Sequence, residues 1–195
     1  MRGAVIDLGG KRARRRGTFA PPVAEDTRWI YVNIDETTSP DLVCDAASVP
    51  LPDGSADCSV CTEVLEHVPD AAACVREAIR LLRPGGVFIA SVPFFYPIHA
   101  DPHDYCRFTA EGLRRLHAGF AVASVASMGG YAGVLGMFIE FGGREWDAGR
   151  PAGLWKRVLF EAGRLLQWYD ARRLAAEDTE AVPRLTTGFF VIAEK

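Results

Sequence analysis

Segment 98–109 carries the side chains best suited to moving a proton. His99 and His103 flank Asp101, and Asp104 follows, so two imidazoles and two carboxylates lie close together in the chain. An imidazole titrates near neutral pH, and a nearby carboxylate orients it and raises its pKa. These are the properties of a general base that takes a proton from a hydroxyl group. We therefore predict His99, His103 and Asp104 as catalytic residues.

The same segment allows two other interpretations. The H-x-D-x-H spacing suggests a metal site, because alternation in an extended segment places all three side chains on one face. Pro102 interrupts that alternation and a metal would need a further ligand from elsewhere, so we predict no metal here. Alternatively the segment is only structural, with Asp104 acting as a cap and Arg107 pairing to hold it closed. If the segment borders a site, Tyr96 and Arg107 are predicted to bind substrate, Arg107 through an acidic group.

A second set of candidate residues follows the first apolar run, in the sequence VIDLGGKRARRRGTF. Gly9 and Gly10 after a short strand are typical of a turn that lets the backbone approach a cofactor. Lys11 stands where such turns carry another glycine, and Pro21-Pro22 stands where the following helix would continue. We therefore expect a short or absent helix and a longer irregular loop.

Five of the six residues from 11 to 16 are Lys or Arg. Three interpretations of this basic cluster stay open. It is a solvated loop, or it supplies side-chain donors to a cofactor carboxylate. In the third interpretation it binds the phosphates of a nucleotide-linked or lipid-linked substrate, for which arginine is well suited.

The elements that must position these residues alternate along the chain. Strands are expected at 4–8, 29–35, 41–44, 58–64, 87–92, 121–127 and 187–194, and helices are expected after Asp70 and Thr109. Strands that alternate with helices form a mostly parallel sheet, with helices on both faces. Ligands of such sheets bind at the carboxyl ends of the strands, which is where the candidate residues lie.

Segment 143–182 departs from this alternation. Residues 154–173 carry apolar side chains at helical spacing, which predicts a helix packed on the domain. A lid, a dimer contact or a membrane-surface helix are the alternatives. We expect a single domain over residues 1–195, with a helical insertion at about 143–182 that would also serve for a homodimer or partner contact.

Composition limits the class of protein. The chain has 195 residues, of which 49% are hydrophobic and 24% charged, as is ordinary for one soluble globular domain. A formal net charge of −3 argues against nucleic-acid binding. No signal peptide is recognisable, and no apolar run is long enough to span a bilayer. The five cysteines suit buried positions in a reducing compartment, so we expect a cytoplasmic protein.

The sequence from Asp45 to Phe94 resembles class I S-adenosylmethionine-dependent methyltransferases. Its elements DAASVPLPDGSAD, EVLEH and LRPGG follow the order and spacing of the small-molecule branch related to the ubiquinone-biosynthesis methyltransferases. Segment 93–109 also resembles a loop of one bacterial subgroup, and the whole resemblance covers residues 4–116 and the final strand. It implies an α/β, Rossmann-like fold with a seven-stranded, mostly parallel sheet whose final strand is antiparallel.

The resemblance also implies a site for S-adenosylmethionine. In the family, the acid that closes the second strand binds both ribose hydroxyls, and Asp35 matches it. The acid after the third strand binds the adenine amino group and the next amide binds a ring nitrogen, which Asp45 and Ala46 match. Thr62 and Glu63 match the residues that line the sulfonium and substrate side. Taken singly, Asp35 and Asp45 also suit turns or caps.

The glycine-rich loop of the family is only partly kept. Asp7, Gly9 and Gly10 match its start, whereas Lys11 and Ala13 replace later glycines. Lys11 also disfavours a nicotinamide dehydrogenase, which would need a glycine there.

The function implied is methyl transfer from S-adenosylmethionine to an oxygen or nitrogen of a small or carrier-linked metabolite. The bacterial subgroup suggests surface-saccharide or secondary metabolism. The alternative is a non-catalytic or repurposed protein of this fold, which acts as a partner subunit or binds another nucleotide-like anion.

Overall fold

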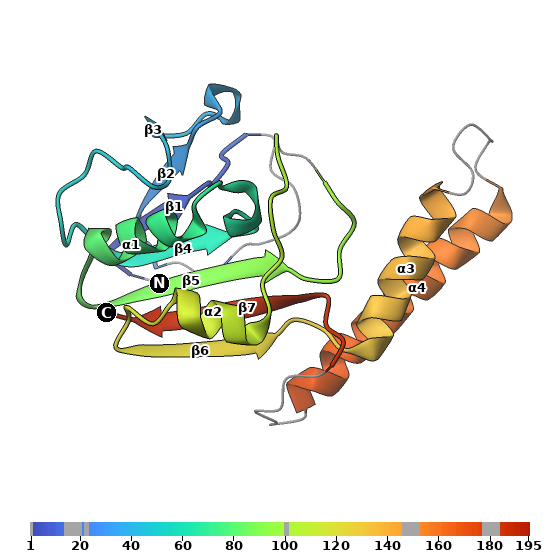
Figure 1. Ribbon diagram of the computed structural model, residues 1–195. Coiled ribbons are helices and arrows are strands. Elements are labelled where there is room, and N and C mark those ends of the chain that lie inside the picture. Colours follow the sequence, from blue (N-terminus) through green and yellow to red (C-terminus); the bar gives the residue numbers. More distant parts are fainter. Residues whose placement is uncertain (1, 14–20, 22–23, 100–101, 146–152, 177–183) are drawn as a thin grey trace. The chain divides into compact units, whose positions relative to one another are not determined.

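The computed structural model describes residues 2–13, 21, 24–99, 102–145, 153–176 and 184–195. These residues form a seven-stranded sheet of strand order β3-β2-β1-β4-β5-β7-β6 (Figure 1). The strands are β1 (Ala4–Leu8), β2 (Arg28–Asn33), β3 (Leu42–Val43), β4 (Ala56–Thr62), β5 (Leu82–Pro93), β6 (Val122–Ser127) and β7 (Gly188–Glu194). The helices are α1 (Ala71–Leu81), α2 (Ala110–Leu116), α3 (Tyr131–Glu145) and α4 (Leu154–Ala176), with the 3-10 turns η1 (Glu36–Thr38) and η2 (Leu65–His67).

The sheet is mostly parallel, and the arrow of β7 runs opposite to that of β5 (Figure 1). The parallel register pairs Leu8 of β1 with Val32 of β2, and Asn33 of β2 with Val43 of β3. Because these partners are the last or second-last residues of their strands, the carboxyl ends of β1, β2 and β3 meet at one edge. The predicted fold class is therefore confirmed.

The central strands are buried along their length. Val5, Ile6 and Leu8 of β1 and Val60 and Cys61 of β4 are each 0% exposed. Burial of successive residues of this kind suits a parallel strand that is covered on both faces. The rigid centre of the sheet thus ends directly at Gly9 and at Thr62.

Helix α1 begins where its sequence signal predicts. The Asp70 carboxylate accepts from the Ala73 amide at 2.9 Å, and Cys74, Val75 and Ala78 turn inward. The next strand begins five residues before the predicted Val87. It does so because Leu82 already pairs with Ala56 of β4, while Gly86 accepts from the Lys195 amide at 3.0 Å.

The described chain divides into two compact units. The first comprises residues 1–92, 98–125 and 190–195, and the second comprises residues 93–97 and 126–189. The helix expected within 154–173 is present as α4, but α3 was not predicted. Its glycines and its nearly uniform apolar character hide the helical period. The single-domain assignment stays a prediction.

Helices α3 and α4 of the second unit touch through their backbones. A methyl group on Gly163 would lie 2.5 Å from the carbonyl oxygen of Gly136, and one on Gly136 would lie equally close to the Gly163 carbonyl. The Asp170 carboxylate of α4 accepts from the Gly130 amide, just before α3 begins. The two helices are therefore held by a glycine crossing and by a cap.

No helix within the described part of the chain is both long and apolar enough to cross a membrane. The 23-residue α4 has the length, but charged residues interrupt it throughout. Segment 177–182 of the expected helical insertion lies outside the described residues, as do residues 146–152.

His117 follows α2 and is fully buried, although α2 itself carries several charged residues. Its ring stacks near Phe88 and Phe120, and Nδ1 lies 2.8 Å from the Leu113 carbonyl, to which it donates. Nε2 has no hydrogen-bond partner in the described chain. Burial lowers the pKa of His117 because the charged imidazolium would lose its hydration.

We expect His117 to make stability fall as the pH drops below its unfolded pKa of about 6.5. Below that pH the unfolded chain binds a proton that the folded protein does not. Stability is thus fully present above pH 6.5 or so and declines by up to about 1.4 kcal/mol per pH unit below it. Urea unfolding of the wild type and of His117→Gln between pH 5.5 and pH 7.5 measures this. An equal decline in both proteins would show that His117 is not responsible.

Candidate active site

The glycine turn after β1 is tied to the end of β2. The Gly9 amide donates to the Val32 carbonyl at 2.8 Å. The side-chain amide of Asn33 donates to the carbonyls of Gly9 at 2.8 Å and of Gly10 at 3.2 Å. Its amide oxygen accepts from the Asp35 backbone at 2.9 Å. Asn33 thus positions both the glycine turn and Asp35, the residue predicted to bind the ribose.

Only glycine fits at these two positions. Gly9 has φ 78°, and a methyl group there would lie 2.4 Å from Val64 Cγ2. A methyl group on Gly10 would lie 2.3 Å from Cγ of Asp7. Asp7, which was predicted to belong to the cofactor site, is buried and accepts from the Trp29 indole at 3.2 Å. It therefore supports the turn by packing against Gly10.

Asp35 lies two residues beyond β2 and is exposed. It caps η1: its Oδ1 accepts from the amide of Thr37 at 2.9 Å and from the Thr37 hydroxyl at 2.7 Å. The predicted strand 29–35 ends earlier, at Asn33, because the chain turns into η1 here. Asp35 therefore caps η1, and it lies at the carboxyl edge of the sheet, where it was predicted to bind the ribose.

Asp45 and Ala46 follow β3 at the same edge. The exposed Asp45 accepts from the Ala47 amide at 2.8 Å, which forms a turn, and Ala46 is buried. Both predicted acids thus act as turn or cap residues. That role is compatible with ligand binding, because a carboxylate has several lone pairs.

Thr62 ends β4, and Glu63 follows with a left-handed backbone at φ 53°. The Glu63 amide donates to the Ser91 carbonyl at 2.9 Å, and the Ser91 hydroxyl donates to the Glu63 carboxylate at 2.7 Å. A positive φ is uncommon for a residue with a side chain, and such strain concentrates at functional sites. Ser91 of β5 holds the predicted Glu63 in this conformation.

The loop after β5 returns to η2. The side chain of Asp104 is 4% exposed and makes a bidentate ion pair with Arg107, and it accepts from the His99 amide at 2.9 Å. Its Oδ2 lies 3.5 Å from His99 Nδ1. The Arg107 guanidinium holds the pKa of Asp104 far below its usual range. Asp104 is therefore a permanent anion that orients His99.

The other predicted catalytic residue, His103, is exposed and its ring lies against Tyr105 at 5.5 Å. Its carbonyl accepts from His67 Nδ1, and the ring of His67 meets that of His99 edge to face at 4.8 Å. The structure thus brings together His99, Asp104 and Arg107 but turns the His103 side chain elsewhere. Asp101 lies outside the described residues.

The basic cluster begins with an internal ion pair. Nη2 of Arg12 donates to both carboxylate oxygens of Asp41, at 2.7 and 2.8 Å, and the guanidinium lies over the ring of Tyr31. The amides of Arg12 and Ala13 both donate to the Thr38 carbonyl. Residues 14–16, and most of the expected irregular loop, lie outside the described residues. Neither cofactor nor phosphate binding by this cluster goes beyond a prediction.

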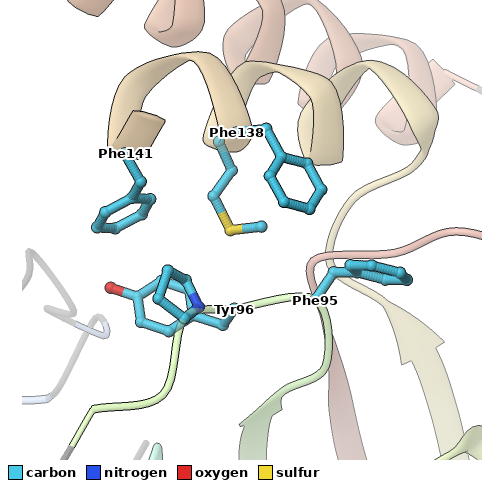
Figure 2. A pocket seen from close by; sticks show the side chains of 6 residues that line it. Phe95, Tyr96, Phe138 and Phe141 are labelled. Atoms are coloured by element: carbon cyan, nitrogen blue, oxygen red, sulfur yellow. The ribbon is translucent and has the colours of Figure 1, made fainter. Parts of the chain in front are cut away.

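The predicted substrate residue Tyr96 belongs to the second unit, where it lines a pocket of about 300 Å³. Phe138 and Phe141 of α3 reach toward Tyr96 and Phe95 (Figure 2). The Tyr96 ring meets Phe141 at 5.4 Å in an edge-to-face contact. Pro97 and Met137 complete a nearly all-apolar lining. Such a pocket suits an aromatic or aliphatic group.

Sequence reasoning assigned no role to Asn33, Ser91 or Glu66. Asn33 and Ser91 each break an apolar strand close to its carboxyl end, which is a detectable signal for a residue that serves a site. Glu66 stands in the EVLEH element but is completely buried, and burial raises its pKa to about 8. No pattern in the sequence distinguishes it from the exposed Glu63.

The fold is shared with solved methyltransferases. A structure of a SAM-dependent methyltransferase from Archaeoglobus fulgidus superposes with a TM-score of 0.58 at 15% sequence identity, covering 100% of this chain and 86% of that one. At this identity the likeness establishes the fold alone. It defines a Rossmann-like methyltransferase fold.

Sequence comparison also finds similarity to methyltransferases. Residues 24–90 match a family described as a methyltransferase domain. A probable S-adenosylmethionine-dependent methyltransferase from Mycolicibacterium smegmatis is 53% identical over 47 residues, or 24% of this chain and 18% of that protein. A ubiquinone biosynthesis O-methyltransferase from Chromobacterium violaceum is 34% identical over 103 residues, or 43% of each.

Residues 24–90 thus resemble a methyltransferase domain, and this resemblance implies S-adenosylmethionine as cosubstrate. The chain spans less than half the length of the curated relatives it matches.

The residues present fit this cosubstrate. The glycine turn forms a cradle that any side chain on Gly9 or Gly10 would fill. Two exposed acids, Asp35 and Asp45, follow successive parallel strands at the same edge. A methionine group lies naturally against an open backbone turn, and carboxylates suit ribose hydroxyls and an adenine amino group.

Proposed function

We propose that this protein transfers the methyl group of S-adenosylmethionine to an oxygen or nitrogen atom of a small or carrier-linked metabolite. The observation that carries the proposal is the joint position of the glycine cradle and the two acids at the carboxyl edge of the sheet. The match of residues 24–90 to a methyltransferase family supports it independently. The kind of substrate, small or carrier-linked, and the acceptor atom, oxygen or nitrogen, are both part of this proposal.

S-adenosylmethionine, when bound, supplies a methyl group activated on a sulfonium. Asp35 would bind the ribose hydroxyls, Asp45 and Ala46 the adenine, and the Gly9–Gly10 turn the methionine end. Thr62 and Glu63 would line the sulfonium side. Because the transfer is an in-line displacement, positioning and the exclusion of water supply most of the rate acceleration.

On the acceptor side, the His99–Asp104 pair is built as an oriented base. Asp104 remains ionised through Arg107 and holds His99, so His99 can accept the proton of a hydroxyl acceptor. The relatives named as ubiquinone biosynthesis O-methyltransferases support an oxygen acceptor.

We expect S-adenosylmethionine to bind with micromolar affinity and Asp35→Asn to weaken this binding by tenfold or more. Asparagine keeps the oxygen that caps η1 but lacks the second anionic acceptor that two ribose hydroxyls require. Losing a hydrogen bond to a charged group costs about 1.5–3 kcal/mol. Calorimetric titration with S-adenosylmethionine measures the difference.

The matched control is Glu36→Gln, which removes the same charge from the neighbouring exposed position. It should bind as the wild type does. Absence of heat and of a thermal shift with the wild-type protein would contradict the proposal and favour the repurposed alternative. Equal weakening in both variants would mean that only the general negative charge matters.

A further inference from the structure

Glu66 is a buried carboxylate without a partner that accounts for it. Its side chain is 0% exposed, and neither oxygen has a hydrogen-bond partner on another residue of the described chain. Buried carboxylates are unfavourable unless they are hydrogen-bonded, paired with a charge or bound to a cation. The Glu66 carbonyl accepts from the Tyr105 amide at 2.8 Å, so its backbone is fixed against the loop after β5.

The neighbouring His67 turns a lone pair toward this carboxylate. Its Nδ1 contacts the carbonyl of His103, which can only accept, so Nδ1 carries the proton. Whenever the ring carries a single proton, Nε2 presents its lone pair, and it lies 3.6 Å from Glu66 Oε1. A lone pair and a carboxylate face each other favourably only across a proton or a cation. Metal-binding histidines typically donate their other ring nitrogen to a carbonyl in this way.

His99 supplies a third candidate ligand. One ligand atom from each of Glu66, His67 and His99 lies within 4.8 Å of the others. His99 Nδ1 faces Asp104 at 3.5 Å, which is the carboxylate–histidine arrangement that orients metal ligands. The side chains of His67 and His99 are 13% and 28% exposed, so an ion can reach the cluster.

The charges around Glu66 also favour a cation. The carboxylates of Glu63 and Asp104 and the guanidinium of Arg107 act on Glu66. With Glu66 deprotonated, as a metal ligand must be, three negative charges and one positive charge leave a formal charge of −2, which one divalent cation would neutralise.

We propose that Glu66, His67 and His99 bind a divalent transition-metal ion of the Zn²⁺ type. Two imidazoles and one carboxylate favour such ions over Mg²⁺ and Ca²⁺, which prefer oxygen ligands. Bonds of about 2.0–2.2 Å place tetrahedral ligand atoms about 3.4 Å apart, so a pair separated by 4.8 Å would have to close by more than about 1 Å. The sequence analysis predicted no metal because the H-x-D-x-H segment would have needed a further ligand from elsewhere. In the structure, η2 supplies two candidate ligands, Glu66 and His67. His99 is the residue of the H-x-D-x-H segment that lies beside them.

This site goes beyond the proposed function. A bound dication lowers the pKa of a coordinated hydroxyl, so an acceptor bound there would release its proton to solvent without His99 as base. Binding of the ion itself requires neither S-adenosylmethionine nor activity, and the two proposals can fail separately.

The test uses the full chain after treatment with a chelator and dialysis. Titration with Zn²⁺ by calorimetry, and with Co²⁺ by visible absorption, should show one equivalent bound. Removing one ligand should weaken binding by more than about 100-fold, because even supporting residues contribute 10- to 100-fold. We expect this loss in Glu66→Gln, and in His99→Ala, whose partly exposed position makes misfolding a lesser concern.

His103→Ala is the matched control, because it removes a nearby imidazole whose ring lies against Tyr105 instead. It should bind Zn²⁺ and Co²⁺ as the wild type does. The proposal is overturned if neither ion binds, if His99→Ala retains full binding, or if His103→Ala loses as much affinity as His99→Ala.

Discussion

Replacing Gly9 by alanine should weaken S-adenosylmethionine binding by about 10- to 100-fold, the equivalent of the roughly 1–3 kcal/mol that overpacking costs. The added methyl group would lie 2.4 Å from Cγ2 of Val64, so the glycine turn must move away from this residue, which precedes η2. That movement also strains the bonds from Asn33 to the carbonyls of Gly9 and Gly10. Calorimetric titration with the cosubstrate measures the loss.

Gly85→Ala is the matched control for this variant. Gly85 has φ 74°, close to the 78° of Gly9, but a methyl group there meets nothing within 4 Å. Both variants carry the cost of about 1–2 kcal/mol for a left-handed alanine, whereas only Gly9→Ala collides with a neighbour. Adding Val64→Ala to Gly9→Ala should restore part of the affinity. If Gly85→Ala weakens binding equally, the collision is not the cause.

The second large effect is expected where α3 crosses α4. Gly163→Ala places a methyl group 2.5 Å from the Gly136 carbonyl oxygen and 3.1 Å from the Glu140 amide. Both obstacles are backbone atoms, so the helices must separate, and we expect a loss of about 1–3 kcal/mol. The readout is hydrogen exchange of the α3 and α4 amides, because the two compact units need not unfold together.

Gly142→Ala serves as the control in the same helix pair. A methyl group there meets nothing within 4 Å, so alanine should stabilise α3 by about 0.5–1 kcal/mol through helix propensity alone. Opposite changes in protection are thus expected for two glycine-to-alanine substitutions. Increased protection in Gly163→Ala would contradict the close crossing.

The sheet and its order of elements were predictable, because each strand and helix carries local signals. The run at 4–8 became β1 with the expected bounds, and Asp70 and Thr109 cap α1 and α2 as expected. The placement of Asp35 and Asp45 just beyond β2 and β3 followed from the same alternation. Their roles as cosubstrate ligands stay predictions.

The rest depended on contacts between distant segments. Glu66 and His99 are far apart in sequence, and no local pattern reveals that the loop after β5 folds back on η2. Glu63 and Glu66 stand in the same short element, yet one is exposed and the other completely buried. Helix α3 escaped prediction because its apolar side chains surround the helix instead of forming a stripe.

Asn33 has a consequence for how the cosubstrate would bind. One side-chain amide joins the turn expected to hold the methionine end to the acid expected to hold the ribose. Ordering either region therefore lowers the entropic cost of ordering the other. The adenosine and methionine halves of the ligand would be thermodynamically linked, so that each half raises the affinity of the protein for the other.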